Sequence, residues 1–437
     1  MTGSSSEFDS KIVSMSEAAA VIESGDRIFA AGLSSTPTEF FIELCKRREE
    51  LTDVQLFTAI LTYPFEFFKP EFRGHITNNS FFFGPLEKKA HGLGNLVPSS
   101  YHLSESREAI RNVHKPNVLA ITVSPPDSEG YMSMGPCGGV GCFAALEIAD
   151  KVILSINESL PFVRGERNRI HVNQATHLTR TDAALAAPPA AAPTETEKEI
   201  AAQILPYVQD GDTLQIGIGG IPNALAYCLD SKKDLGIHTE MLTDSIVHLA
   251  KQGVVTGRFK NYHPGKIVFS FASGSQELLD FTNENDDLVI LPVEEVVSTL
   301  EAARNDNFCA INTCIMVDLT GQVASESVGL TQISGTGGQL DLIRGAKLSK
   351  GGRAFVALTA TRDSKDGLVS NIRLTLPPGT AVTTPRSDAQ YIVTEYGVAN
   401  MRQRSLEERA RSLIEIAHPD FRKELLREAQ SAGVIRI

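Results

Sequence analysis

The chain has 437 residues, about three times a typical domain of roughly 150 residues, which excludes a single small module. Hydrophobic residues make up 42% of it and charged residues 22%, an ordinary globular composition that excludes disorder as the main state. The formal net charge of −12 argues against nucleic acid or an anionic membrane as a partner, so an anionic ligand needs a local site. The 34 glycines indicate many turns beside strands.

The N-terminal segment does not read as a targeting signal. Residues 1–12 are polar and acidic and lack the basic and apolar regions of a secretory leader. No apolar window long enough for a spanning helix occurs, so we expect a cytoplasmic protein. The six cysteines form no C-x-x-C pair, which favours buried free thiols and no metal site. A homo-oligomer is the generic expectation, with dimers commonest.

An Ala/Pro-rich stretch at 183–193 interrupts the chain and is typical of a semi-extended linker. We therefore expect an N-terminal domain over 1–185 and a C-terminal domain over 195–437. Directly after the linker, Thr196 and Glu199 have the spacing of a capping box, which predicts the start of a helix there.

The two halves contain a weak internal repeat. Residues 21–41 and 207–227 each run from a helix end through Gly-Asp into an apolar strand, a small-residue loop, a proline and a new helix. A second strand follows in each half, at 53–61 and 237–244. This alternation predicts an α/β fold with a parallel or mixed sheet flanked by helices in each half. Two such domains would leave a cleft between them, the usual place for a site.

A glycine-rich loop, Gly217 to Ile221, lies at a predicted strand-to-helix junction. Glycines there let backbone N–H groups approach a phosphate while the helix N-terminus adds a favourable dipole. Pro222 stands where a Rossmann fingerprint has its third glycine, and no P-loop motif occurs. Ligand binding and a purely structural turn therefore both remain open.

Three further features could carry chemistry. Glu240 places a carboxylate near the end of a predicted strand. Such an exception to the apolar pattern of a strand tends to mark a functional site, although a solvated glutamate is the simpler interpretation. The Gly337–Gly338 pair could present N–H donors to an oxyanion or be an ordinary loop. Glu395 precedes a Tyr-Gly turn and could equally be part of a strand and its turn.

These features belong to a series of motifs that covers most of the chain. In order they are VSPPDSEGYMSMG at 123–135, GIGGIP at 217–222, TEM at 239–241, VDLTGQVASE at 317–326, SGTGGQLDLIRGA at 334–346, VTTPR at 382–386 and VTEYGVA at 393–399. Together they resemble the acyl-CoA:carboxylate CoA-transferases of the acetyl-CoA hydrolase/transferase family, which include 4-hydroxybutyrate and butyrate enzymes. The resemblance implies two pseudo-equivalent domains with the active site in the cleft between them. It also implies coenzyme A and acyl-CoA as substrates, with no permanently bound cofactor.

The resemblance also assigns roles to residues. Glu240 would be the catalytic nucleophile that becomes a glutamyl-CoA thioester, and Asn312 and Glu395 would line the acyl pocket. The oxyanion and CoA-binding residues would be Gly217, Ile218, Gly219, Gly220, Ile221, Gly337, Gly338, Gln339 and Lys365. The chain departs from the family pattern around Lys365, at 370–372, at 401–403 and over much of the first half, especially 81–105.

The implied chemistry suits a glutamate. An unperturbed glutamate has a pKa of about 4.3, so at pH 7 it would already be an ionised nucleophile without a partner base. The family mechanism is ping-pong transfer of CoA to a short-chain acid such as butyrate or 4-hydroxybutyrate, with dicarboxylates such as succinate or itaconate open. A cluster of Arg164, Arg167 and Arg169 could serve a dicarboxylate or be a solvated basic loop. Hydrolysis of acyl-CoA and a non-catalytic CoA sensor are the alternatives.

Overall fold

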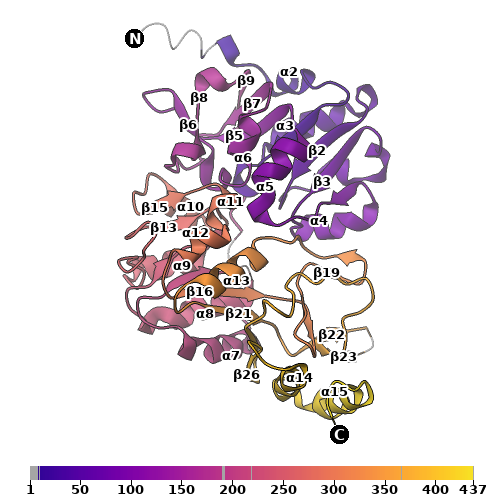
Figure 1. The fold of residues 1–437 in the computed structure, drawn as a ribbon. Helices are drawn as coiled ribbons and strands as arrows, with labels where there is room; N and C mark the ends of the chain where they lie inside the picture. The colour runs from indigo at the N-terminus through magenta and orange to yellow at the C-terminus, as the bar shows by residue number, and fades with distance from the viewer. Residues whose placement is uncertain (1–7, 9, 189–191, 218, 366, 437) are drawn as a thin grey trace. The chain divides into compact units, whose positions relative to one another are not determined.

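A computed structural model describes residues 8, 10–188, 192–217, 219–365 and 367–436 of the chain (Figure 1). The chain divides into two compact units. The first comprises residues 1–189, 242–244 and 268–296, and the second comprises residues 190–241, 245–267 and 297–437. This division differs from the prediction of a single boundary near the linker. The segment 268–296 follows the linker in sequence but packs with the first unit. Within that unit, Val293 donates its N–H to the Gly139 carbonyl at 2.8 Å.

The first unit is built on a seven-stranded sheet in the order β4-β3-β2-β1-β5-β7-β9, and every neighbouring pair is parallel. The strands, in chain order, are β1 Arg27–Ala30, β2 Val54–Thr58, β3 Ile76–Ser80, β4 Leu96–Pro98, β5 Val118–Val123, β7 Lys151–Ile156 and β9 His177–Arg180. All six residues of β5 are buried, as expected for a central strand covered on both faces. The main helices are α2 Met15–Ala20, α3 Thr38–Lys46, α4 Pro85–Ala90, α6 Cys142–Leu146 and α10 Gln276–Thr282.

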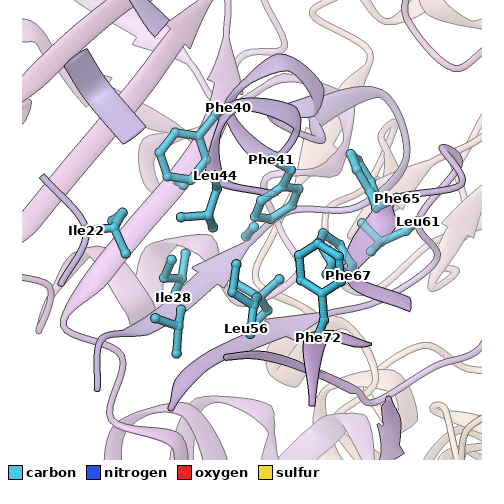
Figure 2. Close-up of a cluster of buried hydrophobic side chains, with 14 of the residues drawn as sticks. Ile22, Ile28, Phe40, Phe41, Leu44, Leu56, Leu61, Phe65, Phe67 and Phe72 are labelled. Atoms are coloured by element: carbon cyan, nitrogen blue, oxygen red, sulfur yellow. The ribbon is translucent and has the colours of Figure 1, made fainter. Parts of the chain in front are cut away.

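The core of this unit is rich in phenylalanine. Phe40, Phe41 and Leu44 project from α3 toward Ile28 and Leu56 of the sheet (Figure 2). The ring of Phe41 meets those of Phe65 and Phe67 edge-on, at centroid distances of 5.3 and 5.5 Å. Such pairs add about 0.5–1.5 kcal/mol each to the burial of apolar area. This packing holds α3, and with it the loop that follows β1, against the sheet.

The second unit contains a six-stranded sheet in the order β11-β10-β16-β21-β25-β26. Its strands are β10 Thr213–Ile216, β11 Gly236–Ile237, β16 Phe308–Thr313, β21 Arg353–Ala357, β25 Tyr391–Thr394 and β26 Gly397–Asn400. All pairs are parallel except β25 with β26, which is antiparallel. The main helices are α7 Glu195–Ile204, α8 Gly220–Cys228, α9 Asp244–Lys251, α12 Thr299–Ala303, α13 Gln339–Leu348, α14 Leu406–Glu415 and α15 Pro419–Ser431.

The internal repeat is confirmed by the strand order. The series β2-β1-β5-β7-β9 of the first sheet has the same chain order as β11-β10-β16-β21-β25 of the second. The repeated Gly-Asp has one structural role in both. Gly25 and Gly211 adopt φ of +85° and +81°, a conformation that favours glycine. Asp26 then binds Lys151 at the start of β7, and Asp212 binds Arg353 at the start of β21.

The helix expected after the linker exists but begins earlier than predicted. α7 is capped by Thr194, whose hydroxyl accepts from the Glu197 N–H at 3.3 Å while the Glu197 carboxylate accepts from the Thr194 N–H at 2.7 Å. The capping box is therefore Thr194–Glu197, and the Thr196–Glu199 prediction was wrong by two residues. Both pairs satisfy the S/T-x-x-E pattern, and Pro193 stops the helix from extending toward the linker.

The structure bears on the expectations about membrane-spanning helices and about the cysteines. Within the described residues, no helix is long and apolar enough to cross a membrane. The six cysteines are free thiols, as predicted. Cys137, Cys142 and Cys309 are buried, whereas the expectation of burial was wrong for the partly exposed Cys45, Cys228 and Cys314.

Candidate functional site

Most of the candidate residues of the second unit lie along the carboxyl edge of its sheet. Because β11, β10, β16, β21 and β25 are parallel, the loops that leave them emerge at one edge, the usual ligand side of an α/β sheet. Glu240 follows β11, Gly217 follows β10, Asn312 lies near the end of β16 and Glu395 follows β25. The strand order thus brings residues far apart in sequence to one side of the unit.

Glu240 lies in a bend between β11 and β12 Met241–Leu242 and is partly buried. The prediction of one strand over 237–244 was therefore wrong, because the chain passes here from one sheet to another and forms two short strands with Glu240 between them. The backbone N–H of Gly338 donates to its Oε2 at 3.0 Å. This hydrogen bond joins the two strongest sequence candidates, the TEM element and the Gly-Gly-Gln turn. A peptide N–H at this distance can stabilise charge on the glutamyl oxygen, both in the free carboxylate and in a derivative formed from it.

The glycine at 338 is required by space. A Cβ built there would lie 2.5 Å from Glu240 Oε2 and 2.7 Å from Val297 Cγ1, closer than real Cβ contacts come. Gly337 before it has a φ of +64°, which L-residues with side chains rarely adopt. The turn ends at Gly338, the N-cap of α13. The two glycines therefore let a helix N-terminus approach the carboxyl group of Glu240 closely.

The electrostatics of Glu240 differ from the simple expectation. Burial raises its pKa to about 7, the nearby Asp341 carboxylate raises it further, and the Gly338 N–H opposes both. The sequence argument that the carboxyl group is fully ionised at pH 7 was therefore wrong for the ligand-free protein. Tertiary packing removes water from this carboxyl group, and desolvation disfavours its charged form. Asp341, in the first turn of α13, is a contributor that sequence reasoning missed.

Asn312 forms a reciprocal amide pair with Gln215 on the neighbouring strand. Asn312 Nδ2 donates to Gln215 Oε1 at 3.1 Å, and Gln215 Nε2 donates to Asn312 Oδ1 at 3.3 Å. Both side chains are buried, at 7% and 1% exposure. The pair satisfies most of the polar atoms of two amides that would be costly to bury alone. Asn312 stays a predicted acyl-pocket residue, held in place by this partner.

The glycine loop after β10 has a clear structural basis. Gly217 donates its N–H to the Ile311 carbonyl at 2.9 Å, which extends the pairing of β10 with β16. Gly219 is the N-cap of α8 and has a φ of +123°. Gly220 and Ile221 begin the helix, where N–H groups lack intrahelical partners. Ile218 lies outside the described residues.

Gly220 has a further neighbour that bears on anion binding. The carboxylate of Glu197, from the capping box of α7, occupies the space that a side chain at 220 would need. An acidic group near the first turn of a helix is favourable. Glu197 therefore already supplies the negative charge that this end of α8 attracts, and the proposed CoA contact at Gly217 to Ile221 stays a prediction.

Glu395 and Lys365 have surroundings separate from those of Glu240. Glu395 accepts the Ala360 N–H with both carboxylate oxygens, at 3.2 and 2.9 Å. Its strand is the fourth along the sheet from the strand that leads to Glu240, roughly 19 Å at about 4.8 Å per step. Lys365 is exposed at the tip of the hairpin formed by β22 Thr361–Ser364 and β23 Gly367–Ser370. Their roles toward a ligand stay predictions.

Two of the three arginines considered for dicarboxylates are already paired with carboxylates within the first unit. Arg164 forms ion pairs with Glu284 and Asp286, and Arg167 forms one with Glu295. The Arg169 guanidinium lies 4.4 Å from the ring centroid of Tyr131. These contacts, together with the exposure of Arg164 and Arg169, favour the interpretation of the cluster as a solvated basic loop. Across the described part of the chain, no group of three or more His, Cys, Asp or Glu side chains is arranged to hold a metal ion.

Comparison with known proteins gives consistent results for both halves. Residues 2–187 match the acetyl-CoA hydrolase/transferase N-terminal domain, and residues 274–429 match the acetyl-CoA hydrolase/transferase C-terminal domain. The 4-hydroxybutyrate coenzyme A transferase of Clostridium kluyveri is 38% identical over 96% of this chain and 97% of its own length. The butyryl-CoA:acetate CoA-transferase of Anaerostipes caccae is 37% identical over 98% of both chains.

The fold comparison agrees. The crystal structure of RipA from Yersinia pestis has a TM-score of 0.91 and 32% sequence identity, covering 99% of both chains. An acetyl-CoA hydrolase of Yarrowia lipolytica is more distant, with 31% identity over 50% of this chain and 40% of its own.

Proposed function

The chain belongs to the acetyl-CoA hydrolase/transferase family and is an enzyme of the CoA-transferase type, and we propose that it transfers coenzyme A from an acyl-CoA to a free short-chain carboxylic acid through a glutamyl-CoA thioester on Glu240. The observation that carries this proposal is the 3.0 Å hydrogen bond from Gly338 N–H to Glu240 Oε2. It pairs a nucleophile with a donor that can stabilise charge on that same group.

The first half-reaction consists of two balanced steps. The Glu240 carboxylate attacks the thioester carbonyl carbon of the acyl-CoA; a C–O bond forms, the C–S bond breaks, and CoA leaves as its thiolate. The thiolate then attacks the glutamyl carbonyl carbon of the resulting anhydride. A new C–S bond forms, the C–O bond breaks, and the donor acid leaves as its carboxylate. The enzyme now holds CoA as a thioester.

The second half-reaction reverses these steps with the acceptor acid. Its carboxylate attacks the glutamyl thioester and releases the CoA thiolate, which then attacks the acceptor's acyl carbonyl and regenerates the Glu240 carboxylate. Each tetrahedral intermediate carries negative charge on an oxygen. The Gly338 N–H would bind that oxygen when the attacked carbonyl belongs to Glu240, and losing one such donor costs roughly 3–4 kcal/mol in other enzymes.

The raised pKa of Glu240 predicts how the reaction depends on pH. At pH 7 the free enzyme would hold this carboxyl group partly protonated, since burial raises its pKa to about 7. Only the ionised form attacks. The acid limb of the pH dependence of kcat/KM should therefore report this group.

The names of the full-length relatives include both kinds of substrate. Some specify 4-hydroxybutyrate, butyryl-CoA and acetate, and others specify succinyl-CoA. We propose that this chain prefers short-chain monocarboxylates to dicarboxylates. The ion pairs that occupy Arg164 and Arg167 support this preference, because they leave those two guanidinium groups already matched with carboxylates. We further propose action in the cytoplasm and as a homo-oligomer.

Borohydride trapping tests the mechanism. Incubation with acetyl-CoA or butyryl-CoA followed by borohydride should abolish activity, and the peptide with Glu240 should show its carboxyl group reduced to an alcohol. Borohydride without acyl-CoA is the control and should leave activity intact. Full activity after both treatments, with an unaltered Glu240 peptide, would contradict the glutamyl-CoA thioester.

Hydrolysis of acyl-CoA is the second candidate, since a distant relative is an acetyl-CoA hydrolase. Water would then replace the acceptor acid. Thiol release from acetyl-CoA without acceptor, at the rate seen with acceptor, would select hydrolysis. Release that depends on butyrate or acetate would select transfer. CoA binding without either activity, retained in Glu240→Ala, would indicate a sensor.

A further inference from the structure

Three sequence motifs of the second unit are not explained by the chemistry of Glu240 alone. They are VASE, which ends at Glu326, the SGTGGQ turn, and VTTPR, which contains Thr383 and Thr384. The structure connects all three by hydrogen bonds between buried side chains. Glu326 is central among them.

The two carboxylate oxygens of Glu326 each accept from one threonine. Thr336 donates its hydroxyl to Oε2 at 3.0 Å, and Thr383 donates its hydroxyl to Oε1 at 3.1 Å. The three residues are 6%, 9% and 3% exposed, in the order Glu326, Thr336, Thr383. Both hydroxyls therefore bond to the two oxygens of one carboxyl group, which joins the SGTGGQ turn to VTTPR.

The main chain at Glu326 holds the same turn from its other end. The Glu326 carbonyl accepts N–H groups from Ile333 at 2.8 Å and from Ser334 at 3.1 Å. Between Glu326 and these residues runs the short hairpin of β19 Ser327–Val328 and β20 Thr331–Gln332. One residue therefore binds the segment 333–336 through both its backbone and its side chain.

The segment leads straight into the pair of glycines beside Glu240. Gly337 and Gly338 lack side chains and have more backbone freedom than other residues, so neighbouring contacts must fix their conformation. Thr336 fixes the near side through Glu326. On the far side, Gln339 Nε2 donates to Thr384 Oγ1 at 3.1 Å, and Thr384 exchanges backbone hydrogen bonds with Val323 at 3.1 and 3.2 Å.

We propose that Glu326 is a positioning residue, which through the Thr336 hydroxyl holds the Gly337–Gly338 turn so that the Gly338 N–H points at the carboxyl group of Glu240. Its effect on catalysis rests on the function proposed above, whereas its effect on the Glu240 carboxyl group does not. A misplaced donor stabilises both the carboxylate and the oxyanion less well, because the hydrogen bond weakens steeply with angle and distance.

The test compares four variants. Thr336→Val and Glu326→Ala remove the link, and Glu326→Gln keeps an oxygen acceptor and the side-chain shape. Asp318→Ala is the matched control, because Asp318 organises the turn between β17 Met316–Asp318 and β18 Val323–Ala324 by accepting from Thr320 and Gln322. Its hydrogen bonds to Thr320 and Gln322 are separate from those that join Glu326 to Thr336 and Thr383.

Two measurements are made on each variant and on the wild type. The ionisation of Glu240 is followed by carbon NMR of the full chain labelled at the glutamate carboxyl carbon, with the signal assigned by Glu240→Gln. CoA transfer from butyryl-CoA to acetate gives kcat and KM. Thr336→Val and Glu326→Ala should raise the pKa of Glu240 and lower kcat by about tenfold to hundredfold, with KM changed little. Glu326→Gln should recover most of the activity.

Different outcomes would refute the positioning role of Glu326 and the proposed CoA transfer. Unchanged ionisation of Glu240 and unchanged kcat in folded Thr336→Val and Glu326→Ala would overturn the positioning role. An equal loss in Asp318→Ala would also overturn it, since general weakening of the region would then suffice. If the wild type forms no covalent CoA adduct, the proposed function fails, and the ionisation measurement still decides the role of Glu326.

Discussion

The Gly338 N–H and the Glu240 carboxylate meet at 3.0 Å across 98 positions of sequence. The sheet brings them together, because Glu240 leaves the edge strand β11 and Gly338 opens α13, which packs on β16 and β21. This contact couples the ionisation of Glu240 to the position of the Gly337–Gly338 turn.

A methyl group at 338 should damage the site without unfolding the chain. Gly338 has a φ of −96°, which alanine tolerates, but its Cβ would lie 2.5 Å from Glu240 Oε2. Gly338→Ala should therefore lower kcat on the order of 10²-fold or more while circular dichroism stays unchanged. Gly92→Ala, where a Cβ meets nothing within 4 Å, is the control. Wild-type turnover in Gly338→Ala would refute the contact.

Glu240 should destabilise the fold at alkaline pH. Its folded pKa of about 7 lies above the ordinary glutamate value of 4.5, so its favourable contribution to stability is complete below pH 4.5 and is lost as pH rises through 7. Glu240→Gln mimics the protonated form. At pH 8.5 it should be more stable than the wild type by up to about 3 kcal/mol, and near pH 4.5 the two should match.

Urea unfolding at both pH values measures this difference. Glu87 is also buried with a pKa of about 7, but it is present in both proteins and cancels. Equal stability of wild type and Glu240→Gln at pH 8.5 would show that the carboxyl group is not desolvated.

The buried amide pair allows a double-mutant cycle. Asn312→Leu should cost about 1–3 kcal/mol, because it leaves the Gln215 amide buried without its partner. Replacing both residues by leucine should recover much of that loss. Unfolding midpoints and kcat/KM are measured for all four proteins. If the double variant is stable but inactive, Asn312 contributes to the reaction as well as to packing; additive stability losses would argue against the pair.

The ion pairs made by the two repeated aspartates should contribute unequally to stability. Arg353→Met leaves Asp212 without its ion-pair partner. Because Asp212 is 1% exposed and burial already raises its pKa, the free energy of unfolding should fall by about 3–5 kcal/mol. Lys151→Met should cost about 1 kcal/mol or less, since Lys151 is more exposed and Asn117 still donates to Asp26 at 2.7 Å. Comparable shifts of the two unfolding midpoints would contradict this ranking.

Much of the fold was predictable from sequence because it depends on local patterns. The pattern of Gly-Asp, an apolar strand, a small-residue loop, a proline and a helix recurs in both halves. Both halves form the expected strand and helix, but α8 begins at Gly220, before Pro222. The capping box was misplaced because Thr194 and Thr196 both satisfy the same spacing rule. The assignment of 268–296 to the first unit involves contacts distant in sequence, such as Val293 with Gly139.

By itself, the sequence determined the α/β class and the duplication, and it marked Glu240 and the Gly-Gly-Gln turn as candidates, since glycines, prolines and charged residues in strands leave local signals. Only the tertiary structure decided that Glu240 faces the Gly338 N–H with a pKa near 7, and that Glu326 binds Thr336 beside that turn. Both depend on desolvation and on distances between residues far apart in the chain, which no local pattern encodes.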